Sequence, residues 1–371
     1  MTVIVQKYGG SSVSDVAGLR AVASRVAETA RKGWKVVVVV SAMGNTTNEL
    51  IALAQAVSSS PTRRELDLLV SVGERVSMTL LAMAVQELGV PAQSFTGSQS
   101  GIITDSQHVS ARILEVRPER IRKALSDGRV AIVAGFQGVS RAKEVTTLGR
   151  GGSDATAVAL AAALGADFCE ICSDVAGVYT ADPRLVGAAT LIESMSTGSA
   201  LALSRAGAKV LQQSALEFAR KSGIKLCATA TASEVGQGTM IGPDEDSSVT
   251  AVSLDRGLRL FQAPDAEVPA SLLRSVRRSW SDGEGVSLLM DERNLHGQAL
   301  PPQWEDCGPL ASVSVVGEGF GAEALPPLVS ALGKLGLIRW WLDASGWTGL
   351  LPLDNAENAL RSAHRISVED R

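Results

Sequence analysis

The run of five valines within Lys35–Ser41 places the strongest constraint on the fold of this chain. Its residues do not alternate between apolar and polar, so both faces of the strand must be buried, as in a parallel sheet covered by helices on both sides. The residues up to 242 therefore predict an α/β domain with a mostly parallel central sheet. Further strands are expected at 3–10, 90–97, 128–136 and 167–174, and helices at 14–32, 47–57, 64–88 and 153–166.

The composition changes beyond a polar linker at 242–248. Five of the six tryptophans, eight of the thirteen prolines and a single lysine lie after it. Strands are expected at 312–319 and 348–353, each followed by one helix. Residues 243–371 therefore predict a separate α+β module that consists of two small subdomains.

Charge and hydropathy exclude several classes of protein. The formal net charge of -4 argues against a nucleic-acid-binding protein, which needs a broad basic face. No apolar run approaches about 18 residues, so no membrane span is expected. The N-terminus has no charged segment followed by an apolar one, as a secretion signal would have, and a cytoplasmic location is expected.

The four cysteines are too few for a disulfide scaffold. Cys169 and Cys172 have the C-x-x-C spacing of a redox or zinc motif, but there is no second pair and no nearby histidine. We interpret both as small apolar residues of a buried strand. No metal site made by protein side chains alone is expected.

Two turns at predicted strand ends carry residues suited to anion binding. In KYGGSSV (Lys7–Val13), Gly9 and Gly10 allow a close approach of backbone N–H groups, and Lys7 adds a positive charge. The alternative is an ordinary tight turn. SAMGNTTNEL (Ser41–Leu50) places small and hydroxyl side chains where open α/β sheets bind ligands, although helix capping by Thr46 or Thr47 is the alternative.

The segment TTLGRGGSDATA (Thr146–Ala157) is the richest in chemistry. Arg150 can hold a carboxylate through two hydrogen bonds, and the glycines after it permit close backbone approach. Ser153 or Asp154 is expected to cap the helix that follows. Glu74 lies in an apolar helical stretch, where it either faces solvent or anchors an ammonium group.

The loop SDVAGVYTADPR (Ser173–Arg184) combines acidic, aromatic and basic side chains that suit a nucleotide. A long surface loop is the alternative, but such loops in compact domains are more often functional. Lys209 offers a second cation for phosphate.

Taken in order over residues 3–241, these motifs resemble those of the aspartate kinases, members of the amino-acid kinase superfamily. ELDLLVSVGERVSM, SFTGSQSGIITDS and VAGFQGVS extend the match between the motifs above. The resemblance implies an αβα sandwich around a roughly eight-stranded sheet. It also implies ATP, Mg²⁺ and L-aspartate as ligands and L-aspartyl-4-phosphate as the product.

The resemblance also implies roles for individual residues. The catalytic pair corresponds to Lys7 and Asp154. The aspartate pocket corresponds to Ser41, Thr47, Glu74, Phe136, Arg150 and Ser153, and the nucleotide site to Gly9, Gly10, Ser173, Asp174, Tyr179, Arg184 and Lys209.

Several segments depart from the family pattern. Ser196–Ala200 lacks two acidic residues, and Gln212 and Gln213 replace residues that usually follow Lys209. Residues 243–371 resemble a divergent pair of ACT regulatory domains, which implies a homodimer. Their effector-binding residues are not recognisable, which predicts weakened feedback and a specialised biosynthetic role. Two alternatives stay open: a kinase for another amino acid or an aspartate analogue, and a catalytically degenerate regulatory subunit. The retained Lys7, Asp154 and Lys209 argue against the latter.

Overall fold

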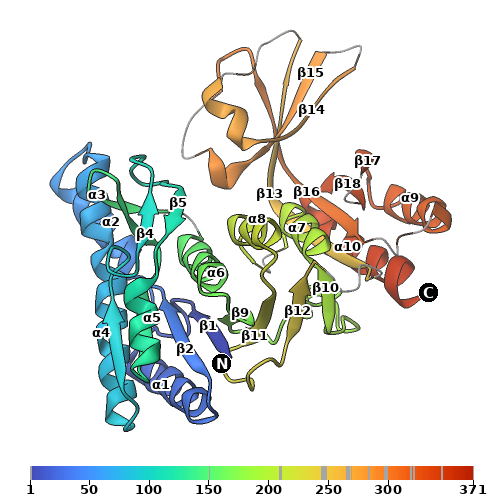
Figure 1. Cartoon of the computed structure of the whole chain (residues 1–371). Helices are drawn as coiled ribbons and strands as arrows, with labels where there is room; N and C mark the ends of the chain where they lie inside the picture. The colour runs from blue at the N-terminus through green and yellow to red at the C-terminus, as the bar shows by residue number, and fades with distance from the viewer. Residues whose placement is uncertain are drawn as a thin grey trace. The chain divides into compact units, whose positions relative to one another are not determined.

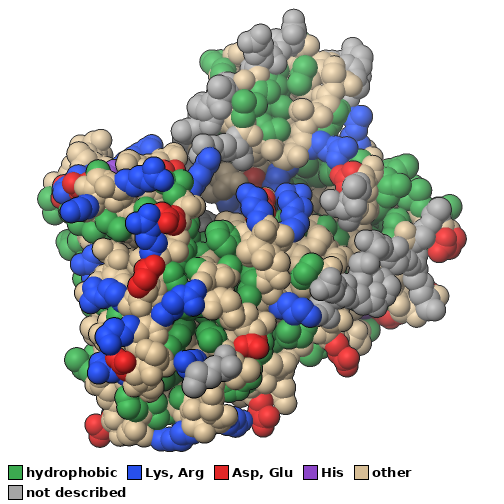
Figure 2. Space-filling model, viewed as in Figure 1, with side chains coloured by type: hydrophobic (Ala, Val, Ile, Leu, Met, Phe, Trp, Pro, Cys, Tyr) green, Lys and Arg blue, Asp and Glu red, His purple; other side chains and the backbone are tan. Residues whose placement is uncertain are grey.

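The computed structural model describes residues 2–149, 151–208, 211–243, 249–264, 268, 270–282, 285–295, 300–317, 320, 322–343 and 346–370. The chain forms two compact units (Figure 1). The N-terminal unit comprises Met1–Val178, Leu191–Leu201 and Lys209–Asp246, and the C-terminal unit comprises Tyr179–Thr190, Ala202–Ala208 and Ser247–Arg371. Two short segments that precede residue 242 are thus built into the second unit. Acidic and basic side chains are interspersed on the face of the N-terminal unit that Figure 2 shows.

An eight-stranded sheet forms the centre of the N-terminal unit in the order β10-β12-β11-β9-β1-β2-β6-β3. The pairs are parallel except β11 with β12, which confirms the predicted mostly parallel sheet. The strands are β1 (Val3–Tyr8), β2 (Lys35–Val40), β3 (Ala92–Phe95), β6 (Val130–Ala134), β9 (Phe168–Ser173), β10 (Ser194–Ser196), β11 (Leu226–Ala230) and β12 (Thr239–Gly242).

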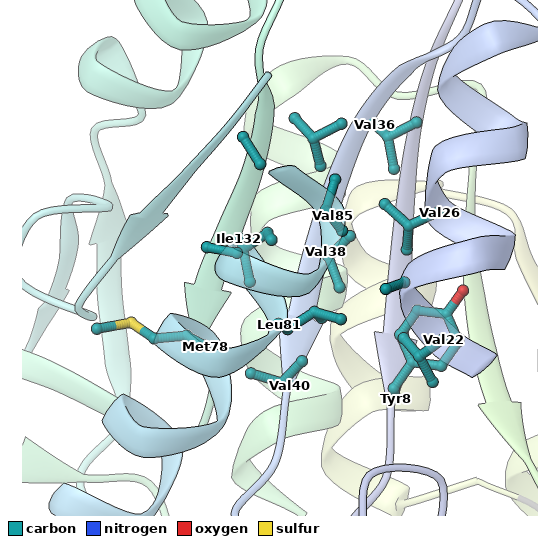
Figure 3. Packing of buried hydrophobic residues seen from close by; sticks show 14 of the residues in the cluster. Tyr8, Val22, Val26, Val36, Val38, Val40, Met78, Leu81, Val85 and Ile132 are labelled. Carbon is teal, nitrogen blue, oxygen red and sulfur yellow. The ribbon is translucent and has the colours of Figure 1, made fainter. Parts of the chain in front are cut away.

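Helices cover both faces of this sheet. Val36, Val38 and Val40 pack against α1 and α4 on one face (Figure 3), whereas α5 and α6 contact β2 from the other face. Every valine of the run is buried, as its lack of alternation predicts. The helices are α1 (Val16–Arg31), α2 (Thr46–Val57), α3 (Arg63–Val70), α4 (Val72–Glu87), α5 (Glu119–Ser126), α6 (Gly152–Leu164), α7 (Thr197–Arg205) and α8 (Gln213–Ser222).

A small second sheet in this unit was not predicted by the sequence. Its order is β5-β4-β7-β8, and each strand has only three or four residues, too few to show a periodicity. The strands are β4 (Ile102–Thr104), β5 (Ile113–Val116), β7 (Gln137–Ser140) and β8 (Val145–Thr147).

The long helical stretch predicted at 64–88 is confirmed, with one interruption at Ser71 that divides it into α3 and α4. The Ser71 carbonyl accepts a hydrogen bond from Gln137 Nε2 at 2.8 Å, which fixes the break against β7. By length and composition alone, Arg63–Glu87 would also be long and apolar enough to cross a membrane. Core helices of folded domains pass the same test, and half of its apolar window is buried within this unit.

A buried polar network joins α1 to β1 and β9. The Arg25 guanidinium lies 3.0 Å from the Glu170 carboxylate, donates to the Tyr8 hydroxyl at 2.8 Å and donates to the Ser233 carbonyl at 2.9 Å. Gln6 Nε2 donates to Glu170 at 2.8 Å. Glu170 is fully buried, so this network supplies its partners inside the core.

The two cysteines of the C-x-x-C pair lie in β9, and both are buried and free. Burial raises the pKa of the Cys172 thiol to about 12, and it raises that of Cys169 well above its ordinary value. Neither thiol is therefore a ready nucleophile, since reactivity requires the thiolate. Their interpretation as buried strand residues is confirmed.

A six-stranded sheet in the order β14-β15-β13-β16-β18-β17 forms the C-terminal unit. Trp347, Leu328 and Leu360 lie in its main core. The strands and helices predicted after residue 311 are confirmed as β16, α9, β18 and α10. The elements are β13 (Ala251–Ala263), β14 (Val276–Asp282), β15 (Gly285–Asp291), β16 (Glu305–Val316), β17 (Arg339–Asp343), β18 (Gly346–Pro352), α9 (Leu325–Gly333) and α10 (Ala356–His364), with short helical turns at Ala270–Ser275, Glu292–Asn294, Ala322–Ala324, Leu353–Asn355 and Arg365–Glu369.

Candidate active site

A cavity of about 330 Å³ lies in the N-terminal unit, at the carboxyl ends of β1, β2 and β6 and the start of α6. This edge of an open parallel sheet is where α/β proteins bind ligands. Its lining is formed by Lys7, Gly10, Ser41, Ala42, Gly44, Thr47, Glu74, Phe136, Gly149, Gly151, Gly152, Ser153, Asp154 and Gln212. The sequence analysis singled out ten of these fourteen residues, counting the two glycines that follow Arg150.

A lysine and an aspartate from distant segments meet in this cavity. Lys7 Nζ on β1 lies 2.6 Å from Asp154 Oδ1 on α6, and the side chains are 13% and 9% exposed. A Cβ at Gly9 would lie 3.5 Å from Lys7 Nζ, so the ammonium group sits over the glycine turn. Asp154 therefore holds the Lys7 ammonium group in place beside the glycine turn.

The start of α6 differs from the sequence prediction. Neither Ser153 nor Asp154 caps the helix, because its N-cap is Gly151, with a φ of 76° and no side-chain cap. Only glycine readily takes that conformation, and a Cβ there would lie 2.5 Å from Gln212 Cγ. The positive end of the helix dipole therefore lines the cavity.

Glu74 lies inside the unit instead of facing solvent. It is 3% exposed, and its Oε1 accepts a hydrogen bond from the Ala42 amide at 3.2 Å. Its Oε2 is buried and has no hydrogen-bond partner. Burial raises the pKa of Glu74 to about 7. A buried acceptor that lines a cavity and lacks a partner calls for a donor from a ligand.

Phe136 has strained backbone geometry where it lines the cavity. Its φ of 66° is rare for a bulky residue and costs on the order of 1–3 kcal/mol. Its carbonyl accepts a hydrogen bond from Leu148 N at 2.9 Å, which ties it to the segment before α6. Gly135, the preceding residue, leaves room for Ser153, whose Oγ would lie 2.8 Å from a Cβ there.

Capping does not explain the hydroxyl residues after β2. The N-cap of α2 is Asn45, which makes no side-chain cap hydrogen bond, and Thr46 donates to the Met43 carbonyl. Thr47 lines the cavity together with Ser41.

The glycine turn after β1 lies beside the end of β9. Ser12 Oγ is 2.8 Å from Thr231 Oγ1, and Thr231 Oγ1 donates to the Ser173 carbonyl at 3.0 Å. These contacts bring two of the predicted nucleotide-binding segments, Gly9–Gly10 and Ser173, into one neighbourhood.

Three further predicted residues, Asp174, Tyr179 and Arg184, do not line this cavity. Asp174 is exposed just after β9. Tyr179 and Arg184 lie in the segment that belongs to the C-terminal unit, where Arg184 forms an ion pair with Asp182 at 2.7 Å. Arg150 and Lys209 lie outside the described residues.

The sequence analysis did not select Ala42, Gly44, Gly149 or Gln212 for the cavity. The glycines stand within motifs that were recognised, so their position after a strand was an available signal. Gln212 was noted only as a departure from the family pattern after Lys209, and its place in the cavity depends on the approach of two distant segments. No cluster of His, Cys, Asp or Glu able to hold a metal occurs among the described residues.

Residues 2–228 match the Amino acid kinase family. The match covers the eight-stranded sheet up to β11 and all residues that line the cavity, so the chain has the fold of the amino acid kinase class.

Sequence comparison with individual proteins shows which branch of the amino acid kinase family this chain resembles. The chain is 48% identical to the aspartokinase of Thermus thermophilus over a 407-residue alignment that covers 100% of both proteins. It is 50% identical over 262 residues to the aspartokinase of Mycobacterium bovis, an alignment that covers 69% of this chain and 62% of that protein. The chain belongs to the aspartokinases, a branch of the amino acid kinase family.

Solved structures agree with this assignment. The crystal structure of E. coli aspartokinase III in complex with aspartate and ADP has a TM-score of 0.83 and 25% identity, and the alignment covers 98% of this chain and 99% of that one. Aspartate kinase from Synechocystis has a TM-score of 0.60 at 34% identity, covering 98% of this chain and 69% of that one.

Proposed function

We propose that this protein transfers the γ-phosphoryl group of ATP to the side-chain carboxylate of L-aspartate, giving L-aspartyl-4-phosphate. The observation that carries the proposal is the single cavity in which the Lys7–Asp154 pair and the unpartnered Glu74 carboxylate oxygen occur together. The relatives are aspartokinases, and the E. coli structure holds aspartate and ADP.

The cavity offers complementary groups for an amino acid. Glu74 Oε2 would accept from the α-ammonium group, and Arg150 would hold the α-carboxylate, as the family resemblance implies. Ser41, Thr47 and Ser153 supply hydroxyl groups, and Phe136 supplies an apolar wall. This set fits a small zwitterion whose second carboxylate is left free to react.

The chemistry needs no general base. The aspartate side chain has a pKa near 3.9 and is already an ionised nucleophile at neutral pH. Catalysis therefore rests on alignment and on offsetting negative charge between two anionic reactants. Lys7 supplies that charge, Asp154 fixes its ammonium group, and Gly9, Gly10 and the start of α6 add backbone donors.

Mg²⁺ fits this site as an ion that arrives with the nucleotide. Mg²⁺ commonly uses one or two protein carboxylates together with substrate phosphates. Asp154 is a cavity carboxylate placed beside the proposed phosphate path, and the described residues form no separate metal cage. When bound, the ion offsets phosphate charge. We propose that Ser173, Asp174, Tyr179, Arg184 and Lys209 contact the nucleotide.

The activity is tested with ATP, Mg²⁺ and L-aspartate, with hydroxylamine present to trap the acyl phosphate as a hydroxamate. A panel of other amino acids runs in parallel. We expect hydroxamate from aspartate, and no loss of signal when millimolar lysine or threonine is added. If hydroxamate formed only with another amino acid, that amino acid and not aspartate would be the phosphoryl acceptor. If no amino acid gave hydroxamate while the protein still bound ATP, the result would support a catalytically degenerate subunit.

The raised pKa of Glu74 predicts a pH-dependent affinity for aspartate. Glu74 must be ionised to hold the ammonium group, and burial raises its pKa to about 7 in the unliganded protein. The KM for aspartate should therefore rise about tenfold as the pH falls from about 8 to about 6. Glu74→Gln should raise the KM and remove this dependence, whereas Glu87→Gln, at the exposed end of the same helix, should change neither. A steep pH dependence that persists in Glu74→Gln would contradict the assignment.

We further propose that the C-terminal unit is a divergent ACT-like module and that it forms a homodimer through β17. This strand pairs only with β18 among the described residues, so it is an outer strand of the sheet. Trp340 and Leu342 are 42% and 57% exposed on it. An exposed apolar edge strand is suited to pairing with a second chain.

Sedimentation tests the dimer. The wild type should sediment as a dimer, and Trp340→Lys with Leu342→Lys should shift it to a monomer, because two charges would be buried at the new interface. Leu273→Lys, a matched change at an exposed leucine of the same unit, should leave the dimer intact. A wild-type monomer at micromolar concentration would refute this proposal.

A further inference from the structure

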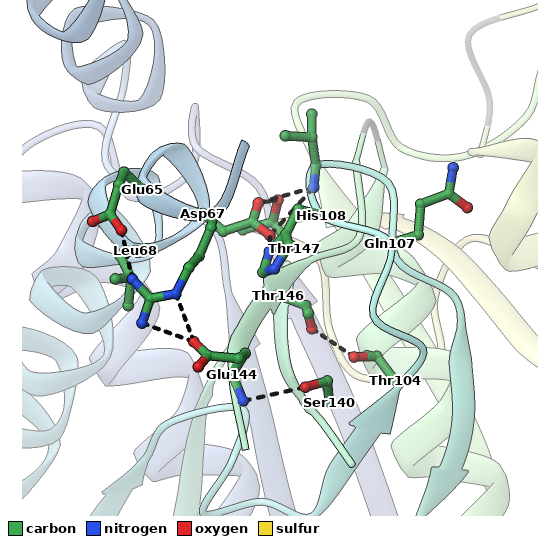
Figure 4. Close-up of polar contacts among 12 residues, drawn as sticks. Glu65, Asp67, Leu68, Thr104, Gln107, His108, Ser140, Glu144, Thr146 and Thr147 are labelled. Atoms are coloured by element: carbon green, nitrogen blue, oxygen red, sulfur yellow. Dashed lines mark hydrogen bonds and ion pairs between the residues drawn. The ribbon is translucent and has the colours of Figure 1, made fainter. Parts of the chain in front are cut away.

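The carboxylate of Asp67 on α3 lies outside the cavity, and the proposed chemistry does not use it. It is fully buried and accepts hydrogen bonds from two other segments (Figure 4). Val109 N donates to it at 3.0 Å, Thr147 Oγ1 donates at 2.5 Å, and His108 Nδ1 lies 2.6 Å from Oδ2. Since a carboxylate oxygen only accepts hydrogen bonds, we place the ring proton of His108 on Nδ1.

These contacts hold the loop between β4 and β5 in one conformation. Val109 has a φ of 73°, which is unfavourable for a β-branched residue unless its surroundings enforce it. Asp67 holds the N-terminal side of this strained residue through His108 and the Val109 amide. Ala111 N also donates to the Thr147 carbonyl at 2.9 Å, so the loop is tied to β8.

The same loop abuts the lining of the cavity. A Cβ at Gly149 would lie 3.2 Å from the Val109 carbonyl oxygen, so the strained residue packs directly against Gly149. Gly149 itself has a φ of 72° and lines the cavity together with Gly151 and Gly152. Arg150, the proposed carboxylate ligand, stands between these glycines in the sequence.

We propose that Asp67 and His108 are positioning residues for the aspartate-binding arm, the segment 147–152. Asp67 anchors the start of this arm through Thr147, and His108 holds the Val109 turn against its glycines. The pair sets the conformation of the described residues on either side of Arg150 in the sequence, Gly149 among them, and does not touch the transferring group. This inference rests on the proposed function, because aspartate is the ligand whose binding it controls.

The test compares His108→Ala with His108→Asn. The alanine variant loses the ring donor, and the KM for aspartate should rise about fivefold to tenfold, the effect of one lost hydrogen bond. The KM for ATP and kcat should stay within about twofold, because Lys7 and Asp154 are untouched. The asparagine amide can donate from nearly the place of Nδ1, so His108→Asn should restore most of the aspartate affinity.

Arg64→Ala is the matched control. Arg64 also lies on α3 and joins it to the β7–β8 hairpin through an exposed ion pair with Glu144 at 2.9 Å. It does not contact the Val109 turn, so its loss should leave the KM for aspartate unchanged. An unchanged KM for aspartate in His108→Ala, or an equal rise for both substrates, would overturn the positioning role.

Hydrogen exchange gives a readout that does not need activity. Peptides that cover 146–154 should exchange faster in His108→Ala than in the wild type, while peptides that cover β2 should not change. Unchanged exchange over 146–154 would refute the inference even if the wild type were inactive. A wild-type protein that forms no aspartyl hydroxamate would instead count against the proposed function.

Discussion

Replacing Lys7 with methionine should lower kcat for aspartyl phosphate formation about a thousandfold, the scale seen when a preorganised charge or donor is removed from a transition state. Lys7 Nζ is 2.6 Å from Asp154 and lies over the glycine turn. Among the described residues that line the cavity there is no second lysine or arginine that could replace it. Methionine keeps the length and the apolar stem of the side chain. Circular dichroism should therefore show an intact fold.

Two further variants sharpen this experiment. Lys32→Met, at an exposed lysine just after α1, should leave kcat unchanged. The effects of Lys7→Met and Asp154→Asn should be strongly non-additive, because the two side chains act as one unit. If Lys7→Met retained more than about a tenth of the wild-type rate, the lysine would have no place in the mechanism.

The second large effect is expected on stability. Arg25→Met should destabilise the N-terminal unit by about 3–5 kcal/mol, because it leaves the fully buried Glu170 without its ionic partner. The donors that remain to Glu170 are neutral: Gln6 Nε2 and the Gly236 amide, each at 2.8 Å. Guanidinium unfolding followed by circular dichroism measures the loss.

A double variant separates the buried charge from packing. Arg25→Met combined with Glu170→Gln should recover much of the stability, since no buried charge is then unpaired. Arg20→Met, on the exposed side of the same helix, should change stability by less than about 0.5 kcal/mol. A loss below about 1 kcal/mol in Arg25→Met would show that Glu170 is satisfied by its neutral partners alone.

The order of the main elements could be predicted because each carries its own local signal. The valine run identified a strand buried on both faces, and glycines marked the turns at strand ends. The short strands β4, β5, β7 and β8 have no such signal, since three or four residues hold too little pattern. The hydrogen bond from Gln137 to the Ser71 carbonyl joins residues 66 positions apart, and no local pattern reports it.

The sequence identified candidate side chains, whereas their environment and contacts came from the tertiary structure. Lys7, Glu74 and Asp154 were selected as residue types in suitable motifs, but the sequence left Glu74 open between solvent and ligand. The structure places it 3% exposed with a raised pKa, because the surrounding segments remove water from it. The predicted cap at Ser153 or Asp154 failed because tertiary contacts put Gly151 at that position and turned Asp154 toward Lys7.

The sequence by itself determined the strand and helix order of the core, the glycine turns and the residue types available for binding anions and an amino acid. These properties depend on neighbours along the chain, where periodicity and backbone preference act. The tertiary structure alone decided that Lys7 meets Asp154, that Asp67 joins three segments, and that residues 179–190 belong to the C-terminal unit. Desolvation and hydrogen bonding between distant segments produce these features, and both exist only once the chain has folded.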